Sequence, residues 1–251
     1  MIDYTFDDFK TTVDALFGEH GCPWDKSRTL TNLRGDLLEE CYEAVDAVDK
    51  GDAALLCEEL GDVMLAVMLY AKTAERGGLF GVGDVIDGIV KKIIRRHSHV
   101  FGGVKAETPE ESLKNWENEK RLEKSEPTRA ERLRDVPKTF PALMRAQSVL
   151  KRASGYGGET PDKEALLDGL VRSAAEIKDA ANAGNVRAED VGAILLNIAD
   201  ISRLYEINAE LSLTNMIETF INVFGNAGNA VLTAFDGIQS SFEEEIFDEQ
   251  D

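Results

Sequence analysis

Two groups of acidic residues are spaced so that each could present its carboxylates on one face of a helix. The first is Glu39-Glu40-x-x-Glu43, and the second, after fifteen intervening residues, is Glu59-x-x-Asp62. Side chains three or four positions apart on a helix are neighbours, so each group projects its acids together. The spacing therefore predicts carboxylates that converge from two neighbouring helices.

A divalent cation would offset the repulsion and the burial cost of such an arrangement. The second group interrupts an otherwise apolar helical line, Leu55-Glu59-Asp62-Ala66-Leu69, which would point its acids toward a core. Because neither group contains His or Cys, we expect oxygen ligation of Mg²⁺, with Mn²⁺ as the alternative. Each acidic group alone is more simply explained as a solvated helix face, and it is their combination that favours a metal site.

Two further features could contact an anionic, aromatic ligand. Lys92, Arg95 and Arg96 lie on the following helix and could hold a polyphosphate against the metal. Cations near a helix C-terminus also favour the helix dipole, which is an alternative explanation. Trp24, in a turn-rich loop, could stack on a nucleobase, although tryptophan more often serves in packing.

Composition and charge limit the class of protein. The chain has 251 residues, 43% of them hydrophobic and only six of them proline, which favours an all-α protein. Its net charge of −19 argues against nucleic acid or an anionic membrane as a partner. Three cysteines without a CxxC pair and the absence of a signal-peptide pattern indicate a cytoplasmic protein.

Helical periodicity predicts where the elements lie. Leu37, Cys41, Val45 and Val48 predict the core-facing stripe of one helix, and the apolar run 63–71 predicts a helix buried on all sides. The expected helices cover residues 5–18, 30–50, 53–76, 84–97, 108–124, 141–153, 162–183, 188–211 and 213–224.

The helix order predicts two tandem helical-bundle domains related by an internal repeat, the second degenerate. We expect a catalytic domain at 1–124, a polar linker at 125–139, a degenerate domain at 140–240 and an acidic tail at 241–251.

The repeat alignment pairs Glu40 with Glu176, Glu43 with Asp179 and Glu59 with Asp190. Other charged positions of the first half are lost in the second, where their places are taken by Ala175, Ala193, Thr219, Asn222 and Val223. The scaffold would therefore persist in the second half without the acids and cations of the site.

Five motifs in order resemble the MazG-type nucleoside triphosphate pyrophosphohydrolases of the all-α NTP pyrophosphatase superfamily. The resemblance covers nearly the whole chain. Its motifs are GCPWD at 21–25, the acidic groups at 39–62, RRHSHVF at 95–101 (similar to RRHPHVF), WE at 116–117 and PALMRAQ at 141–147. The sequence departs from the family pattern at Ser98, where Pro is usual, and at Arg28-Thr29, where Gln-Thr is usual.

The resemblance implies a homodimer that hydrolyses an NTP or dNTP between the α- and β-phosphates, with Mg²⁺, to NMP and pyrophosphate. It implies that Glu39 either supports the metal ligands or orients the attacking water, and that Lys92, Arg95 and Arg96 contact phosphates. The metal ligands that it implies are Glu40, Glu43, Glu59 and Asp62.

Two other functions remain open at this point. One is a non-catalytic nucleotide-sensing module or dimeric scaffold. The other is a narrower enzyme of the same superfamily, acting on dUTP, dCTP or a phosphoribosyl nucleotide.

Overall fold

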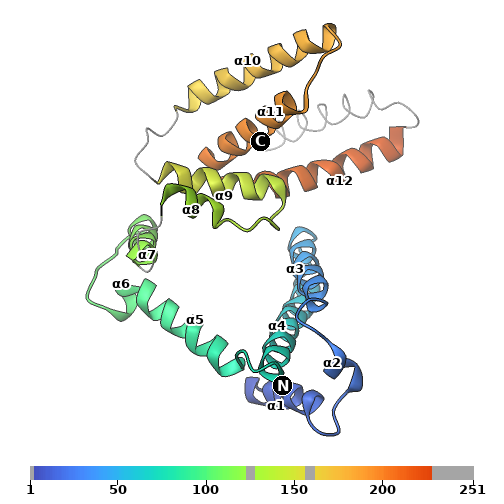
Figure 1. Cartoon of the computed structure of the whole chain (residues 1–251), viewed down its shortest axis with the longest axis vertical. Coiled ribbons are helices and arrows are strands. Elements are labelled where there is room, and N and C mark those ends of the chain that lie inside the picture. The colour runs from blue at the N-terminus through green and yellow to red at the C-terminus, as the bar shows by residue number, and fades with distance from the viewer. Residues whose placement is uncertain (1–2, 123–127, 156–161, 228–251) are drawn as a thin grey trace, which may run out of the picture. The chain divides into compact units, whose positions relative to one another are not determined.

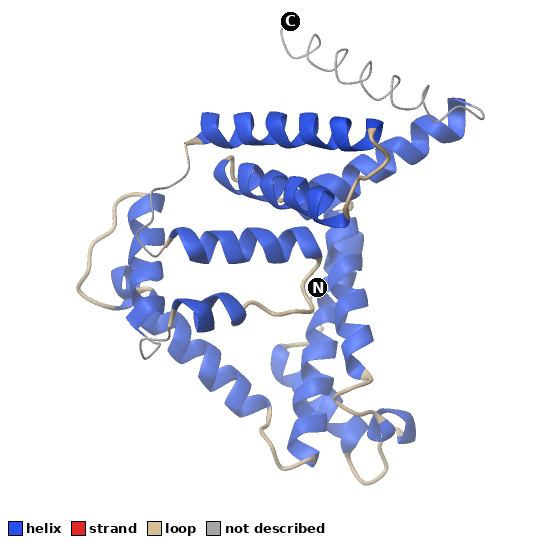
Figure 2. Ribbon diagram, turned by 45° about the horizontal axis from the view of Figure 1, so that its top comes forward, coloured by secondary structure: helices blue, strands red, loops and turns tan. Residues whose placement is uncertain are grey.

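The computed structural model describes residues 3–122, 128–155 and 162–227, and throughout these ranges the regular elements are helices (Figures 1 and 2). The all-α class expected from the sequence is confirmed. The chain divides into two compact units, residues 1–124 and 125–251. No helix in the described ranges combines the length and apolar character needed to cross a membrane. The expected acidic tail at 241–251 lies outside the described residues.

Unit 1 is organised around a hairpin of two long helices, α3 (Leu33–Asp49) and α4 (Ala53–Arg76), which pack along each other (Figure 1). The other helices of the unit contact this hairpin or one another. They are α1 (Phe6–Phe17), α2 (Pro23–Ser27), α5 (Val82–Arg96), α6 (Ser98–Phe101) and α7 (Pro109–Leu122).

The apolar core of unit 1 lies at the end of the hairpin where α1 packs against α4. Val13 of α1 meets Met68 and Ala71 of α4, and Val82 at the start of α5 closes the cluster. Three partly buried side chains pack around it: Phe9, Phe17 and Leu65. This core fixes the C-terminal half of α4 and leaves its N-terminal half to be held by α3.

A Gly-Asp pair makes the tight turn between α3 and α4. Gly51 has a φ of 65°, a left-handed conformation that glycine adopts without strain. Its N–H donates to the carbonyl of Val48 at 3.0 Å. The Asp52 carboxylate then caps α4 by accepting from the backbone N–H groups of Ala54 and Leu55, both at 3.0 Å. The turn thus fixes how far α4 is displaced along α3.

The expected core stripe of α3 is wrong. Cys41, Val45 and Val48 are exposed, while the buried side of α3 carries Ala44 and Ala47. These small side chains let α4 pack closely, which turns the larger apolar residues away from the hairpin. Glu40 is half-buried on the same side as the two alanines, so the acid faces the interhelical contact.

The apolar run of α4 is also less buried than expected. Within this run Ala66, Met68, Leu69 and Ala71 are buried, but Met64 and Val67 are exposed, as is Leu60 before it. The expectation of a helix covered on every side is therefore corrected, because unit 1 packs against only one side of α4 here.

Unit 2 is a helical bundle in which α9 (Ala142–Ser154) and α10 (Lys163–Asn182) both contact α11 (Ala188–Leu204). Helix α12 (Ala209–Ala227) contacts α9 and α11. The Glu210 carboxylate accepts from the backbone N–H of Leu143 at 3.1 Å, and Gln147 bridges the carbonyl of Ile207 and the N–H of Ala209. These contacts hold the start of α12 against the start of α9.

Two expectations for the second half are corrected. The segment expected as a linker contains helix α8 (Arg129–Arg134), because Thr128 and Glu131 form a capping box that nucleates it. The expected single helix at 188–211 is divided after Leu204, where Glu206 adopts a φ of 59° and the Ile207 N–H folds back to the carbonyl of Ser202.

The α10–α11 turn has the same hydrogen-bond pattern as the α3–α4 turn. Gly184 has a φ of 69° and donates to Ala181 three residues earlier, as Gly51 does to Val48. Aligning the two glycines places Glu176 at the position of Glu43, three residues away from the register expected from sequence. The same alignment places Arg172 and Ser173 at the positions of Glu39 and Glu40. The internal repeat itself stays a prediction.

The left-handed turn gives a stability prediction. Gly51→Ala should lower the free energy of unfolding by about 1 kcal/mol, because alanine at φ 65° is strained. Gly35→Ala is the matched control: Gly35 lies in α3 with no atom near an added Cβ, so its replacement should stabilise by roughly 0.5–1 kcal/mol. Urea unfolding of both variants measures this. Changes of the same sign would contradict the role given to the turn.

Candidate functional site

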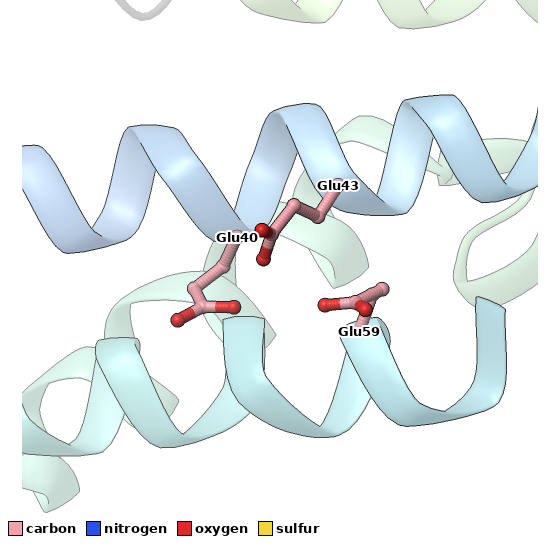
Figure 3. A group of neighbouring side chains, drawn as sticks. All are labelled: Glu40, Glu43 and Glu59. Carbon is pink, nitrogen blue, oxygen red and sulfur yellow. The ribbon is translucent and has the colours of Figure 1, made fainter. Parts of the chain in front are cut away.

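Three carboxylates from α3 and α4 come together between the helices. Glu40 and Glu43 project from α3 and Glu59 from α4, toward one another (Figure 3). Each offers an oxygen atom, and these oxygens all lie within 4.8 Å of one another. The positions follow from helical spacing on α3 and from the turn at Gly51, which brings the N-terminal half of α4 alongside.

The electrostatics of this group are those of crowded like charges. Burial raises the pKa of Glu40, and the negative charges of Asp62, Glu43, Glu59 and Glu39 raise it further. Burial also raises the pKa of Glu59, followed by the charges of Glu43 and Asp62. Every charge named here is a carboxylate, so within the described part of the chain no cation lowers the pKa of these two acids.

Asp62 and Glu39 adjoin this group without belonging to it. Asp62 is half-buried on α4 and acts on the pKa of both Glu40 and Glu59, but it is not among the three residues whose oxygens lie within 4.8 Å. Glu39 is exposed on α3 and has the weakest influence on Glu40. Of the four ligands implied by the family resemblance, the structure therefore brings three into contact range and leaves the fourth beside them.

The basic cluster is not brought to the acids within one chain. Lys92 and Arg95 are exposed on α5, a helix that contacts α4, α6 and α7. Arg96 lies 4.9 Å from the ring centroid of Trp116 on α7, so its guanidinium is engaged at the other end of α5. Figure 1 shows α5 leading away from the α3–α4 hairpin.

Trp24 lies on α2 with 62% of its surface exposed, and sequence reasoning missed the residues that hold it. The Arg28 guanidinium lies over the Trp24 ring, 4.5 Å from its centroid, and forms an ion pair with Asp36 of α3. A signal was present, because Asp36, Glu40 and Glu43 follow the i, i+4, i+7 spacing of one helix face.

The equivalent region of unit 2 carries no comparable acidic group in the described part of the chain. Asp190, which was expected to match Glu59, is paired with Arg187, with Nη2 and Oδ1 2.6 Å apart. This pairing lowers the pKa of Asp190. The negative charge of Asp190 is therefore offset by Arg187, at the N-terminus of the same helix.

Comparisons with known proteins agree with these observations. The family described as the MazG nucleotide pyrophosphohydrolase domain matches residues 28–101, which include α3, α4 and α5. The nucleoside triphosphate pyrophosphohydrolase/pyrophosphatase MazG of Thermotoga maritima is 32% identical over 219 residues, covering 87% of this chain and 84% of that protein. The nucleoside triphosphate pyrophosphohydrolase of Escherichia coli K12 is 34% identical over 206 residues, covering 80% and 78%.

A third relative is longer. The uncharacterized protein YabN of Bacillus subtilis is 37% identical over 224 residues, which are 88% of this chain and 45% of that protein, so this chain spans less than half of it. The two relatives that align along most of both sequences decide the assignment. This chain belongs to the MazG nucleotide pyrophosphohydrolase family.

Proposed function

We propose that unit 1 is a Mg²⁺-dependent nucleoside triphosphate pyrophosphohydrolase that adds water at the α-phosphorus and releases NMP and pyrophosphate. The observation that carries the proposal is the group Glu40, Glu43 and Glu59, whose carboxylate oxygens lie within 4.8 Å of one another. Family membership supports the reaction class, since relatives carry the name nucleoside triphosphate pyrophosphohydrolase.

The residues fit a hard divalent cation. All donors are carboxylate oxygens, the ligand type that Mg²⁺ and Mn²⁺ prefer, and the raised pKa values of Glu40 and Glu59 are what a cation would reverse. Glu40, Glu43 and Glu59 would hold the ion, with Asp62 beside them as the fourth ligand. Bound Mg²⁺ would supply Lewis-acid chemistry at the phosphate oxygens.

The remaining residues would orient and stabilise the reactants. Glu39, at the exposed edge of the acidic group, would accept a hydrogen bond from the attacking water and hold it toward the α-phosphorus. Lys92, Arg95 and Arg96 would offset the charge of the leaving pyrophosphate. Because α5 does not reach the acids of its own chain, another copy of the chain would have to bring these cations to the acidic group.

We propose that a homodimer supplies that arrangement. Helix α5 exposes one apolar face, which includes Val85, Ile86, Ile89 and Ile93, and α4 exposes a second apolar stripe next to its acids. Contiguous exposed apolar surface of this kind marks protein interfaces. Association of two copies through these faces would cover both surfaces and bring the basic end of α5 in one copy toward the acidic hairpin of the other.

A narrower substrate range within the superfamily, or nucleotide sensing without catalysis, are the competing functions. Pyrophosphate release from a panel of NTPs, dNTPs and phosphoribosyl nucleotides, with Mg²⁺ and with EDTA, separates them. A sensor would bind nucleotide without releasing pyrophosphate in any of these reactions.

Asp62→Asn should lower kcat/KM for pyrophosphate release by about 100-fold or more, because a charge that holds the metal is lost. EDTA should abolish the reaction of the wild-type protein, and added Mg²⁺ should restore it. The matched control is Asp46→Asn on α3, since Asp46 is exposed and its ion pair among the described residues is with the exposed Lys50. Wild-type turnover in the Asp62 variant would show that the site is misassigned.

Glu40→Gln should change stability with opposite signs in EDTA and in Mg²⁺. Because the Glu40 pKa is raised in the folded protein, the folded state binds this proton more tightly than the unfolded state. Wild-type stability is therefore lost as pH rises through this pKa, and glutamine avoids that loss. In EDTA at pH 8 the variant should melt above the wild type.

With saturating Mg²⁺ the order should reverse, because only the wild type gains the full binding energy of the ion. Thermal denaturation in the two buffers measures both states. If Mg²⁺ raised the melting temperature of both proteins equally, Glu40 would not be a ligand.

Ile89→Lys should convert the dimer to a monomer at micromolar concentration, since an interface that buries Ile89 would have to bury an unpaired charge. Gly88→Lys is the control, because it adds the same side chain one position away, on the polar side of α5. Light scattering coupled to size-exclusion chromatography measures the mass. A monomeric wild type, or a dimeric Ile89 variant, would contradict this interface.

A further inference from the structure

Arg28 connects an exposed aromatic ring to the helix face that carries the acidic group. Its guanidinium lies over the Trp24 ring and also forms an ion pair with Asp36. Arg28 itself is 9% exposed, whereas Trp24 is 62% exposed. A buried, doubly engaged guanidinium therefore supports one face of a ring that is otherwise open to solvent.

The segment that carries this pair is fixed at several points. The Arg76 side chain, at the end of α4, donates to the carbonyl of Lys26 and, at 2.8 Å, to the carbonyl of Arg28. Lys26 Nζ donates to the carbonyl of Glu19 at 2.9 Å. Gly21 is required in the approach to α2, because an added Cβ would lie 2.1 Å from the carbonyl oxygen of Leu16. Trp24 thus projects from an anchored base.

Asp36 places the ring relative to the carboxylates. Asp36 and Glu40 are one turn apart on the same face of α3, about 6 Å along the helix axis, and Glu43 follows on that face. Trp24 is therefore held next to the N-terminal end of the acidic group. A ligand whose phosphates meet Glu40 and Glu43 would extend its other end along α3 toward Asp36 and the ring.

We propose that Trp24 is a stacking platform for the nucleobase and that Arg28 and Asp36 are the positioning residues that hold it. The proposal rests on the proposed function, since it takes the phosphate end of the ligand to lie at the acidic group. Stacking uses the π-face that every base has, so the platform would bind purine and pyrimidine nucleotides alike. If Arg28, Asp36 and Trp24 served only to stabilise the fold, no ligand would bind the exposed face of the Trp24 ring.

Trp24 can report directly on base stacking. The chain has two tryptophans, so a Trp116→Phe variant leaves Trp24 as the sole indole fluorophore. AMP and UMP should each quench its emission, and inorganic triphosphate, which has no base, should leave the emission unchanged. This measurement needs no turnover. If nucleotides quenched Trp24 but the protein released no pyrophosphate, the stacking proposal would stand and the proposed catalytic function would be wrong.

Kinetics separate positioning from general structural damage. Trp24→Ala should raise KM for nucleotides by about 5- to 100-fold, the range for losing one base–aromatic stack, with kcat changed by less than about 3-fold. Trp24→Phe should recover most of this loss. Arg28→Gln and Asp36→Asn should each raise KM by about 3- to 10-fold, because either change frees the ring without removing it.

The matched control is Arg34→Gln, since Arg34 is exposed on α3 and its side chain contacts the carbonyl of Thr31. It should leave KM unchanged. Inorganic triphosphate, used as a competitive inhibitor, should keep its inhibition constant in every variant.

Two results would overturn the proposal. One is a failure of AMP and UMP to quench Trp24. The other is a rise in the inhibition constant of inorganic triphosphate that matches the rise in nucleotide KM, since that would place the damage at the phosphate end. Circular dichroism and melting temperatures establish that each variant is folded.

Discussion

Three like-charged carboxylates lie between two packed helices, and most of unit 1 can be understood from what that arrangement requires. Burial and the neighbouring negative charges raise the pKa of Glu40 and of Glu59, so the helices that carry these acids must be held together by other contacts. Ala44 and Ala47 supply close packing beside the acids, and the core around α1 fixes the far end of α4. Apolar packing elsewhere in the unit therefore holds the two helices together in spite of the repulsion between these acids.

The same hairpin leaves much of its apolar surface uncovered. Large apolar side chains of unit 1 are exposed on α5 and on the side of α4 next to the acids. In a small helical unit, acids placed between two helices occupy contact area that apolar side chains would otherwise fill. Less apolar surface is therefore buried within the unit. The acids, the uncovered faces and the separation of α5 from the hairpin are together consistent with a site completed by assembly.

Unit 2 has a helix–helix turn similar to that of unit 1, with different charges around it. Gly184 has the same left-handed conformation as Gly51 and donates to the same position three residues earlier. With the two glycines aligned, Arg172, Ser173 and Glu176 stand at the positions of Glu39, Glu40 and Glu43. Asp190 forms an ion pair with Arg187. A turn depends on local backbone conformation, whereas a carboxylate cluster is costly unless a ligand uses it.

The sequence by itself determined the all-α class, the bounds of α4, the capping of α1 and the acids that converge, because these follow from spacing and local capping. It did not determine which side of α3 is buried. Cys41, Val45 and Val48 are as apolar as a core stripe should be, and only the close approach of α4 to Ala44 and Ala47 decides against them.

The tertiary structure also decided which charged residues meet. Lys92, Arg95 and Arg96 follow the acids closely in sequence, yet α5 carries them away, whereas Arg28 reaches Asp36 and Trp24 across a loop. Helical spacing predicts neighbours within one element because the backbone fixes them. Contacts between elements depend on the turns and on the packing of the whole unit, which no local pattern specifies.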